Sequence, residues 1–446
     1  MKKLAIMLLV TAMLMPVITG CSKDDGDEWA PFKKDEQASL KVLFWDEKMF
    51  YDDYGMMFQS EFPNVDLEVI TYPSNTDPPI PFYELFNRHI EQNQLDILMV
   101  TDDFRWLVEQ GMLLEMDPLI ERDKIDLDGY MPAVLSMLRK QGDGKLFGLS
   151  PNFSSNGIYY NIDLFQKHGI DLPHDSMTWE EIFELAQRFP TGIDGNDSLY
   201  GFTFDFFSSP LEKILLSLLA QHKKVLSSEG TEVQLDSASW RTTFEWLVSI
   251  VQSGALYHPS QEEQAISFRD MKEHRFLNGT SAMIYTTEYF INNLNRSEIN
   301  WGVASAPVDP LNRTKSSAYS LGQTFVIVKQ SPNARAAWEF VKYVNSDSFA
   351  QLKSRAGGDL LFSRSKYIRP QKERDISSLY KLEAIADMTD EFDSFDVGLK
   401  LRLVHVIVNE LIEVIDQAKT LDEAIESMQE EGTALLFQAR SAAAAE

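Results

Sequence analysis

The sequence predicts an α/β protein with more than one lobe, because of its alternating strand and helix patterns, its amphipathic helices and its length. Predicted strands and helices alternate near the start of the folded part, with strands at 40–44, 65–69 and 97–100 and helices at 51–61 and 82–92. Strand–helix–strand order at this spacing is typical of βαβ units on a mostly parallel sheet. A chain of 446 residues also exceeds one ordinary hydrophobic core, so two or more lobes are expected.

Each strand prediction depends on a local apolar pattern. Residues 40–44 form a short and mostly apolar run, and residues 97–100 form a second run that is typical of a buried strand. Val65, Leu67 and Val69 alternate with acidic residues, which is the period-two pattern of a half-buried strand.

Helical spacing continues downstream. Apolar residues at i, i+3, i+4 and i+7 predict one helix face at Ile182, Leu185, Ala186 and Phe189. Thr178 and Glu181 form a capping-box pattern in front of it, and Ser331 with Pro332 predicts the start of another helix. Further apolar stripes cover 337–344 and 401–415. We interpret these stripes as core packing, because none has the pattern of a cofactor site.

The first residues have the pattern of a secretory signal. Lys2 and Lys3 precede an apolar run at 4–18, which is shorter than a membrane-spanning helix requires. Ile18-Thr19-Gly20-Cys21 then resembles a bacterial lipobox. This resemblance implies a signal peptide at 1–20, a lipid on the Cys21 sulfur, and a lipidated tether at 21–39. Cys21 is the only cysteine, so no internal disulfide can form.

The charge of the chain argues against two classes of partner. The formal net charge is −27, whereas nucleic-acid binding depends on clustered lysine and arginine. The same charge opposes electrostatic adhesion to anionic lipids. We therefore expect no nucleic-acid partner, and membrane attachment only through the lipid on Cys21.

The sequence shows no established catalytic motif. His-Glu-x-x-His, Gly-x-Ser-x-Gly and P-loop patterns are missing, and the histidines lack metal-ligand spacing. Ser363 to Lys366 matches Ser-x-x-Lys, but the two further elements of that enzyme class are missing. Carboxylates are abundant, so a glycosidase pair stays open on counting alone. We expect a protein that is not an enzyme and that holds neither a metal nor a cofactor.

A series of weak motifs in a fixed order carries a family resemblance. The segments are 40–45, 62–65, 95–100, 109–114, 145–149, 159–165, 169–181, 276–283, 302–307 and 331–341. The most specific are Lys145-Leu146-Phe147-Gly148-Leu149 and Tyr159-Tyr160-Asn161-Ile162-Asp163-Leu164-Phe165. Together they resemble the extracellular solute-binding proteins (family 1) of ABC importers, the group that includes maltose-binding protein.

The resemblance implies a two-lobe, type II periplasmic-binding-protein-like fold with a hinge. The implied amino lobe covers 36–152 and 285–345, the carboxyl lobe covers 153–284 and 346–440, and 441–446 is a frayed tail. A small ligand, expected to be a sugar or oligosaccharide, would bind between the lobes and pass to the permease subunits of an ABC importer. The protein would act as a monomer on the extracellular face of the cell membrane.

Several candidate ligand contacts follow predicted strands, because α/β sheets bind ligands at the carboxyl ends of their strands. Ser155 and Asn156 lie where the first hinge crossing implied by the resemblance meets the cleft, and the resemblance implies an aromatic contact at Tyr289. Gly322 and Gly358 would let the backbone approach the ligand or the hinge. The candidates are Trp45, Glu47, Asp102, Asp103, Ser155, Asn156, Phe206, Tyr285, Glu288, Tyr289, Gly322 and Gly358. Aromatic rings can stack on sugars, and carboxylates can accept hydrogen bonds from hydroxyl groups. The alternatives are core packing for Trp45 and Phe206, and a helix cap for one of Asp102 and Asp103. The segment after Gly358 departs from the proline-containing turn of the family.

The sequence leaves two other functions open. A lipid-anchored carbohydrate-active enzyme would use some of the same surface residues, and a ligand-sensing protein would share the binding fold with a different partner. The missing catalytic motifs and the ordered family motifs favour solute capture over catalysis.

Overall fold

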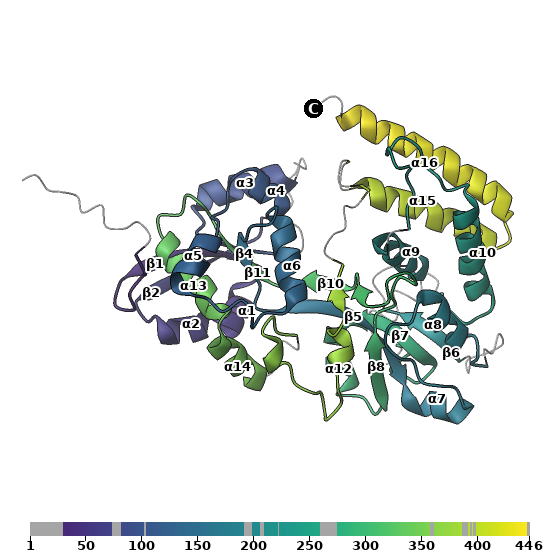
Figure 1. Ribbon diagram of the computed structural model, residues 1–446, viewed down its shortest axis with the longest axis horizontal. Coiled ribbons are helices and arrows are strands. Elements are labelled where there is room, and N and C mark those ends of the chain that lie inside the picture. Colours follow the sequence, from purple (N-terminus) through teal and green to yellow (C-terminus); the bar gives the residue numbers. More distant parts are fainter. Residues whose placement is uncertain are drawn as a thin grey trace, which may run out of the picture.

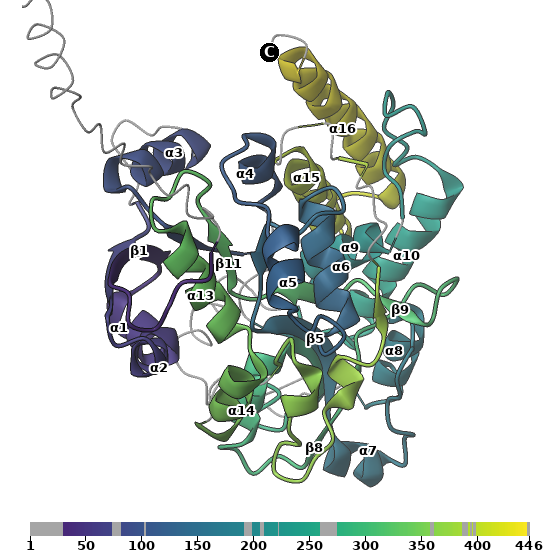
Figure 2. The same ribbon diagram turned by 60° about the vertical axis from the view of Figure 1, so that its left-hand side comes forward.

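The protein forms two lobes, each built around its own β-sheet (Figures 1 and 2). In a computed structural model, the structure describes residues 30–73, 82–101, 104–190, 199–205, 209–221, 223–258, 274–356, 361–385, 391–392, 395 and 398–443. The predicted signal peptide and residues 21–29 of the predicted tether, with Cys21, lie outside the described residues. The two-lobe α/β class predicted from the sequence is confirmed.

The amino-lobe sheet has the order β2-β1-β3-β11-β4. Its strands are β1 (Ala38–Phe44), β2 (Val65–Thr71), β3 (Ile97–Val100), β4 (Gly148–Leu149) and β11 (Thr324–Ile327). The strands β1, β2 and β3 are parallel, with Val42 opposite both Val69 and Ile97. The three predicted strands are therefore confirmed. The strand β3 is buried along its whole length, whereas β2 alternates buried and exposed residues at first, as its sequence pattern predicts.

Helices surround this sheet. They are α1 (Glu47–Phe50), α2 (Met56–Glu61), α3 (Phe82–Asn93), α4 (Arg105–Glu109), α5 (Asp117–Asp123), α6 (Pro132–Gln141), α13 (Ala334–Val344) and α14 (Asp347–Ala356). The π-helix η1 (Tyr51–Gly55) joins α1 to α2. The predicted start of α13 at Ser331 is wrong, because the Ser331 hydroxyl donates to Asp96 Oδ1 at 2.5 Å and the helix begins later.

The carboxyl-lobe sheet is organised around one long strand, β5 (Phe153–Asn161). Its partners are β10 (Tyr319–Leu321), β7 (Ser281–Thr287) and β8 (Trp301–Ser305), and β6 (Tyr200–Phe204) lies beyond β7. The pair β6–β7 is parallel, and every pairing of β5 is antiparallel. The prediction of mostly parallel sheets is therefore wrong for this lobe, because the central strand β5 runs opposite to each of its three partners β7, β8 and β10.

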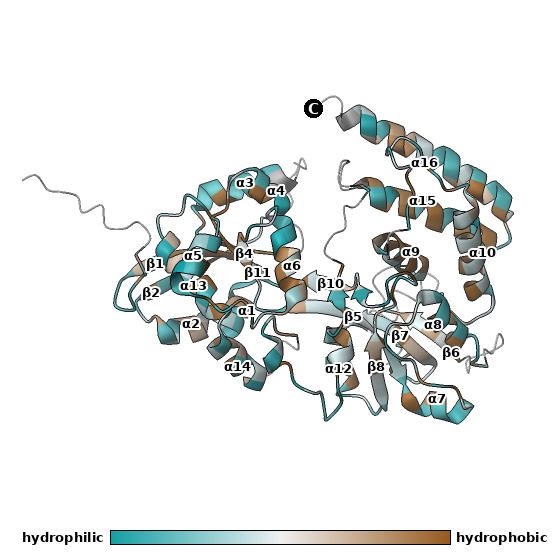
Figure 3. Cartoon of the chain, viewed as in Figure 1, coloured by the Kyte–Doolittle hydropathy of each residue, from teal (hydrophilic) through white to brown (hydrophobic). Residues whose placement is uncertain are grey.

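Amphipathic helices cover the carboxyl lobe. They are α7 (Ile162–His168), α8 (Trp179–Ala186), α9 (Pro210–Ala220), α10 (Ala238–Gln252), α12 (Ile291–Leu294), α15 (Gly398–Ile415) and α16 (Leu421–Ala443). Figure 3 shows that α9 is mostly hydrophobic, whereas the outer helix α16 carries many hydrophilic residues. The predicted capping box of α8 is confirmed, because the Thr178 side chain accepts from the Glu181 amide and the Glu181 carboxylate accepts from the Thr178 amide.

Short elements complete the described chain. They are η3 (Glu288–Phe290), η4 (Ser365–Tyr367), η5 (Ser377–Leu379), and the two-stranded sheet of β9 (Lys315–Ser316) and β12 (Glu383–Ala384). Within the described ranges, no helix is both long enough and apolar enough to cross a membrane.

The hinge consists of adjacent crossings between the sheets. Asn152 links β4 to β5, and Gln323 links β10 to β11. The Gln323 amide donates to Asn152 Oδ1 at 3.0 Å. Segment 361–363 lies beside the crossing that leads into β5. The Phe153 amide donates to the Leu361 carbonyl at 3.1 Å, and the Ser363 amide donates to the Pro151 carbonyl at 3.0 Å.

The lobe boundaries implied by the resemblance do not follow the sheets at two places. Residues 285–345 were assigned to the amino lobe, yet β8 and β10 pair with β5. Residues 346–440 were assigned to the carboxyl lobe, yet Phe349 of α14 stacks on Tyr54 at 5.6 Å (Figure 1). We propose boundaries that place β8 and β10 with the carboxyl lobe and α14 with the amino lobe.

Candidate ligand-binding site

An exposed tryptophan stands at one edge of the amino-lobe sheet. Because β1, β2 and β3 are parallel, the residues after them share this edge. Trp45 follows β1 and is 47% exposed, and its ring stacks on Tyr72, which follows β2, with centroids 4.3 Å apart. The sequence analysis missed Tyr72, although the strand-end rule that found Trp45 applies to it equally.

Tyr72 is held in place from several sides. Its hydroxyl donates to the Met99 carbonyl, and burial raises its pKa above the usual range. Its ring lies 6.0 Å from Phe86, which in turn packs edge-on against Trp106 at 5.6 Å. This aromatic series fixes one face of the Trp45 indole and leaves the side chain about half exposed.

The acidic residues after Trp45 divide into two roles. Asp46 caps α1, because its Oδ1 accepts from the Met49 amide at 2.8 Å. Glu47 is exposed in the first helical turn, where a carboxylate is favoured by the helix dipole. Glu47 therefore stays a candidate contact, whereas the Asp46 carboxylate already has a structural partner.

A second polar group lies at the edge of the carboxyl-lobe sheet. Asp205 directly follows β6, and its Oδ2 accepts from the Thr286 hydroxyl of the parallel strand β7 at 3.1 Å. Asp205 also forms an ion pair with Lys213 of α9. Burial lowers the pKa of Lys213 to about 8. The candidates from the sequence include neither Asp205 nor Lys213, and Lys213 reaches this edge from α9.

The element η3 presents one residue outward between two buried ones. Tyr289 is 57% exposed, whereas Glu288 is 2% and Phe290 is 6% exposed. Glu288 Oε2 accepts from the Ser154 hydroxyl at 2.8 Å and from the Ser155 amide at 3.0 Å. Tyr289 stays a candidate contact, and we assign Glu288 to the hinge.

Several other candidates have structural surroundings. Ser155 is 2% exposed inside the hinge, and Asn156 is half-buried beside it. The Tyr285 ring packs on Trp179 at 5.2 Å, and burial raises its pKa, so it belongs to the edge of the carboxyl-lobe core. At Gly322, an added Cβ would lie 2.0 Å from Asn152 Oδ1, so this close approach serves the hinge.

The remaining candidates cannot be placed. Asp102, Asp103, Phe206 and Gly358 lie outside the described residues, and so does the lipidation candidate Cys21. Among the described candidates, Trp45 and Glu47 are exposed on the amino lobe, and Asn156 and Tyr289 lie in or next to the hinge strand β5. The other four candidates are buried or packed against neighbouring residues: Ser155, Tyr285, Glu288 and Gly322.

Comparison with known proteins decides the family. A profile of the family described as bacterial extracellular solute-binding protein matches residues 57–360, more than half of the chain. This chain belongs to that family. The match covers β5, η3 and the crossings at Asn152 and Gln323, so the described candidates other than Trp45 and Glu47 lie within it.

Similar proteins include solute-binding proteins of several bacteria. The arabinooligosaccharide-binding protein of Bacillus subtilis (strain 168) is 22% identical over 369 residues, which cover 77% of this chain and 76% of that protein. The sn-glycerol-3-phosphate-binding periplasmic protein UgpB of Brucella abortus (strain 2308) is 23% identical over 211 residues. That second match covers 45% of each chain, so this chain aligns with less than half of that relative.

Solved structures of solute-binding proteins share the fold. A sugar transporter protein of Rhizobium etli in an open conformation has a TM-score of 0.65 and 20% identity, covering 89% of this chain and 98% of that chain. The sugar-binding protein MalE of Xanthomonas citri has a TM-score of 0.65 and 18% identity, covering 92% and 100%. At these identities the likeness shows the two-lobe solute-binding fold.

The Ser-x-x-Lys match of this solute-binding protein does not form a nucleophile–base pair. Ser363 is 0% exposed, and Lys366 forms an ion pair with Asp347 at 2.5 Å. Arg364 is buried between them in the chain and donates to the Asn345 carbonyl at 3.1 Å. In the part of the chain that the structure describes, no group of histidine, cysteine, aspartate or glutamate could hold a metal ion.

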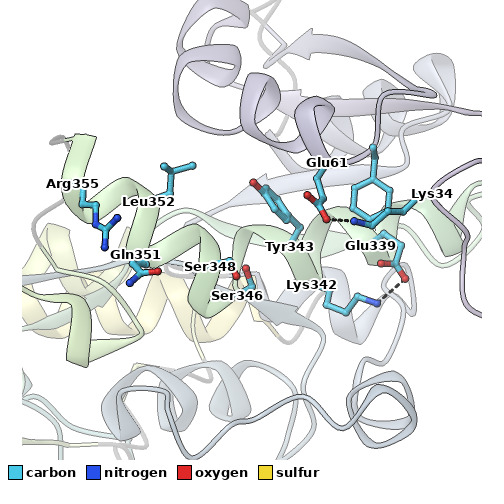
Figure 4. A pocket seen from close by; sticks show the side chains of 11 residues that line it. Lys34, Glu61, Glu339, Lys342, Tyr343, Ser346, Ser348, Gln351, Leu352 and Arg355 are labelled. Carbon is cyan, nitrogen blue, oxygen red and sulfur yellow. Dashed lines mark hydrogen bonds and ion pairs between the residues drawn. The ribbon is translucent and has the colours of Figure 1, made fainter.

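A separate groove of about 570 Å³ lies on the amino lobe, between the first described segment, α2, α13 and α14 (Figure 4). Its charged lining includes two ion pairs, Lys34 with Glu61 and Lys342 with Glu339. None of the candidate contacts lines it. We therefore keep this groove apart from the candidate ligand-binding site.

Proposed function

We propose that this solute-binding protein captures a sugar or oligosaccharide between its lobes and delivers it to the permease subunits of an ABC importer. The observation that carries the proposal is the half-exposed Trp45 ring, braced by Tyr72 at a sheet edge where α/β folds bind ligands. Tyr289 supports it as an exposed ring at the end of β7 on the other lobe.

The chemistry of these residues suits a carbohydrate. An aromatic ring can cover the apolar face of a sugar ring, and the rigid indole and phenol lose little conformational entropy on contact. The carboxylate of Glu47 and the amide of Asn156 can exchange hydrogen bonds with hydroxyl groups. The relative that binds arabinooligosaccharides and the sugar-binding MalE support the same ligand class.

A phosphate-bearing ligand fits the described residues less well. Phosphate sites normally use arginine, lysine or helix amino termini as donors. Among the described candidate positions the charged groups are acidic, and the nearby Lys213 is already paired with Asp205. The charge at these positions therefore favours a neutral ligand over a glycerol phosphate of the kind named for the relative in Brucella abortus.

We propose that a lipid on Cys21 attaches the protein, as a monomer, to the extracellular face of the cell membrane. The first described residues support a tether that leaves the body at a defined point. The Arg335 guanidinium donates to the Ala30 carbonyl at 2.6 Å and to the Pro31 carbonyl at 2.9 Å, and it pairs with Glu36 at 3.2 Å. The tether therefore departs from the beginning of α13.

In this proposal the protein performs no chemistry on its ligand. Ligand contacts on both lobes would favour the closed arrangement, and an importer could distinguish it from the open one. A carbohydrate-active enzyme would instead convert its ligand, and a sensing protein would bind the same ligand but act on a receptor.

A thermal-shift screen of residues 22–446 tests the proposal. The panel contains monosaccharides, arabinooligosaccharides, maltooligosaccharides and sn-glycerol 3-phosphate. A ligand at a hundredfold excess over its Kd stabilises the native state by about 2.7 kcal/mol. A shift with one sugar class, with the sugar recovered unchanged, supports capture for transport. A shift with glycerol phosphate alone, or cleavage of the sugar, would contradict it.

A further inference from the structure

The hinge strand β5 has partners along both edges. On one edge it pairs with β10 at Phe153–Ser155 and with β8 further along, and the Asn156 amide donates to the Ala318 carbonyl at 3.2 Å. On the other edge it pairs with β7 from Asn156 onward, and the Phe153 amide donates to the Leu361 carbonyl. Amide groups of alternate residues point to the same edge of a strand, so Ser155 faces the second edge as Phe153 does.

A carboxylate completes this second edge. The strand β7 ends at Thr287, and the next residue, Glu288, accepts the Ser155 amide at 3.0 Å and the Ser154 hydroxyl at 2.8 Å through the same oxygen. Its side chain therefore occupies the position between the last β7 partner and the Leu361 carbonyl. Hydrogen bonds to an ionised acceptor are stronger than those between neutral groups, and a buried amide without a partner is costly.

Glu288 and Phe290 together fix the residue between them. Phe290 is 6% exposed and packs against Tyr159 at 6.3 Å and Phe276 at 6.1 Å. Glu288 is bound to β5 by the hydrogen bonds described above. Tyr289 thus projects outward from a single 3₁₀ turn that is anchored on both sides and is bound to the first part of β5 through Ser154 and Ser155.

We propose that Glu288 is a positioning residue that ties the Tyr289 ring to the hinge strand β5, so that a contact made by Tyr289 is transmitted to the hinge. The expected effect of Glu288 on ligand affinity rests on the proposed function. The hydrogen bonds between Glu288 and β5, and their effect on the hinge, do not depend on it. The carboxylate itself touches no ligand, because it is buried against Ser154 and Ser155.

Hydrogen exchange of the ligand-free protein tests the tie. In Glu288→Gln the charge is lost with little change of shape, and peptides that cover 153–156 and 288–290 should exchange about tenfold faster than in the natural protein. Glu339→Gln is the matched control, because Glu339 is also a buried glutamate but lies on α13, where its partner is Lys342. It should leave both peptides unchanged.

Ser154→Ala provides a second, milder variant that removes one hydrogen bond from the opposite side. It should accelerate exchange at 288–290, so the test remains possible if Glu288→Gln fails to fold. Unchanged exchange of both segments in the folded variants would overturn the proposal, whatever the protein binds.

Binding of arabinotriose and maltotriose, measured by calorimetry, tests whether Glu288 affects ligand affinity through Tyr289. For the sugar that the natural protein binds, Glu288→Gln should weaken affinity about tenfold, which is about 1.4 kcal/mol. In a Tyr289→Ala background the same change should add little, because Glu288 acts through that ring. If the losses of binding free energy from Glu288→Gln and Tyr289→Ala added fully, Glu288 would not act through Tyr289. Failure of the natural protein to bind any sugar would contradict the proposed function instead, and the exchange experiment would still decide the tie.

Discussion

At the residue scale, the aromatic and buried polar side chains decide what the sheet edges can do. Trp45 keeps about half of its surface exposed although it stacks on Tyr72, so an indole face is held ready in a fixed orientation. Glu288 shows the opposite outcome, because a charged side chain expected at the ligand is buried against the hinge. Equivalent positions after strand ends therefore supply both candidate ligand contacts and hinge contacts.

Replacement of Trp45 by alanine should weaken sugar binding about tenfold or more, since truncation of an aromatic contact in a binding site costs on the order of 1–3 kcal/mol. Titration calorimetry with the sugar found in the screen measures this effect. Phe437→Ala is a matched control, because Phe437 is an aromatic residue that is 72% exposed on α16. Equal affinity of the Trp45 variant and the natural protein would remove Trp45 from the site.

Buried His274 should make stability fall in mild acid. The side chain is 1% exposed, and burial lowers its pKa to about 4 from the usual 6.5. Below pH 6.5 the unfolded chain binds a proton that the folded chain does not bind until about pH 4. The free energy of unfolding should therefore decrease over this interval, by up to about 3 kcal/mol.

Urea unfolding between pH 7 and pH 4 checks this prediction. His274→Gln should flatten the pH dependence, whereas His405→Asn should retain it, because the His405 side chain is 60% exposed. The same slope in the His274 variant and in the natural protein would show that other groups cause the acid sensitivity.

At the element scale, the hinge is a set of short crossing segments that are tied to neighbouring helices. The Tyr54 hydroxyl of η1 donates to Gln323 Oε1, and Asn152 Nδ2 lies 3.4 Å from the same hydroxyl. The buried Lys353 of α14 pairs with Asp53 of η1 at 2.9 Å. The π-helix η1, which follows Trp45 and α1 in the chain, thus contacts the hinge residues Asn152 and Gln323. It therefore links the sheet edge that carries Trp45 to the hinge.

Alanine at Gly322 should disturb this hinge. An added Cβ would lie 2.0 Å from Asn152 Oδ1 and 2.8 Å from the Asn152 carbonyl oxygen, so the two crossings would have to move apart. We expect a loss of about 1–3 kcal/mol of stability, as for other overpacked sites, together with weaker ligand binding. Thermal unfolding and calorimetry measure the two effects, and a variant with natural stability and affinity would contradict the close approach.

At the scale of the whole molecule, two lobes are connected by β5 and its neighbouring crossings, an arrangement in which hinge motion can occur. One hydrophobic cluster is centred on β1–β3 and β11 and extends through the hinge to Tyr159 of β5, Ile284 of β7 and Trp301 of β8. A second cluster is centred on α8, α9, α10 and α15 of the carboxyl lobe. Because these four helices pack apart from the amino-lobe helices, a change in the relative orientation of the lobes would be taken up at the hinge strands. Ligand capture by closure is therefore compatible with the architecture.

Small-angle X-ray scattering should detect this closure. A saturating sugar should decrease the radius of gyration relative to the ligand-free protein, because contacts on both lobes favour the closed arrangement. The Trp45→Ala variant should show a smaller decrease at the same sugar concentration. An unchanged radius of gyration at saturation would contradict closure.

Sugar affinity should also be nearly independent of salt. The chain carries a net charge of −27, but a neutral ligand gains no long-range attraction that salt could screen. We expect less than about a twofold change in Kd between low and moderately high ionic strength. A strong salt dependence would indicate a charged ligand and would favour the glycerol phosphate alternative.

The sequence by itself determined the α/β class, the strands β1, β2 and β3, and the capping box of α8, because these follow from spacings of a few residues and local hydrogen bonds. It also placed Trp45 and Tyr289 at the ends of strands. Only the tertiary structure decided that Tyr72 braces Trp45, that α14 packs on the amino lobe, and that Glu288 binds Ser155. Those outcomes depend on contacts between residues distant in the chain, and local patterns carry no information about which distant segments pair or which carboxylate becomes buried.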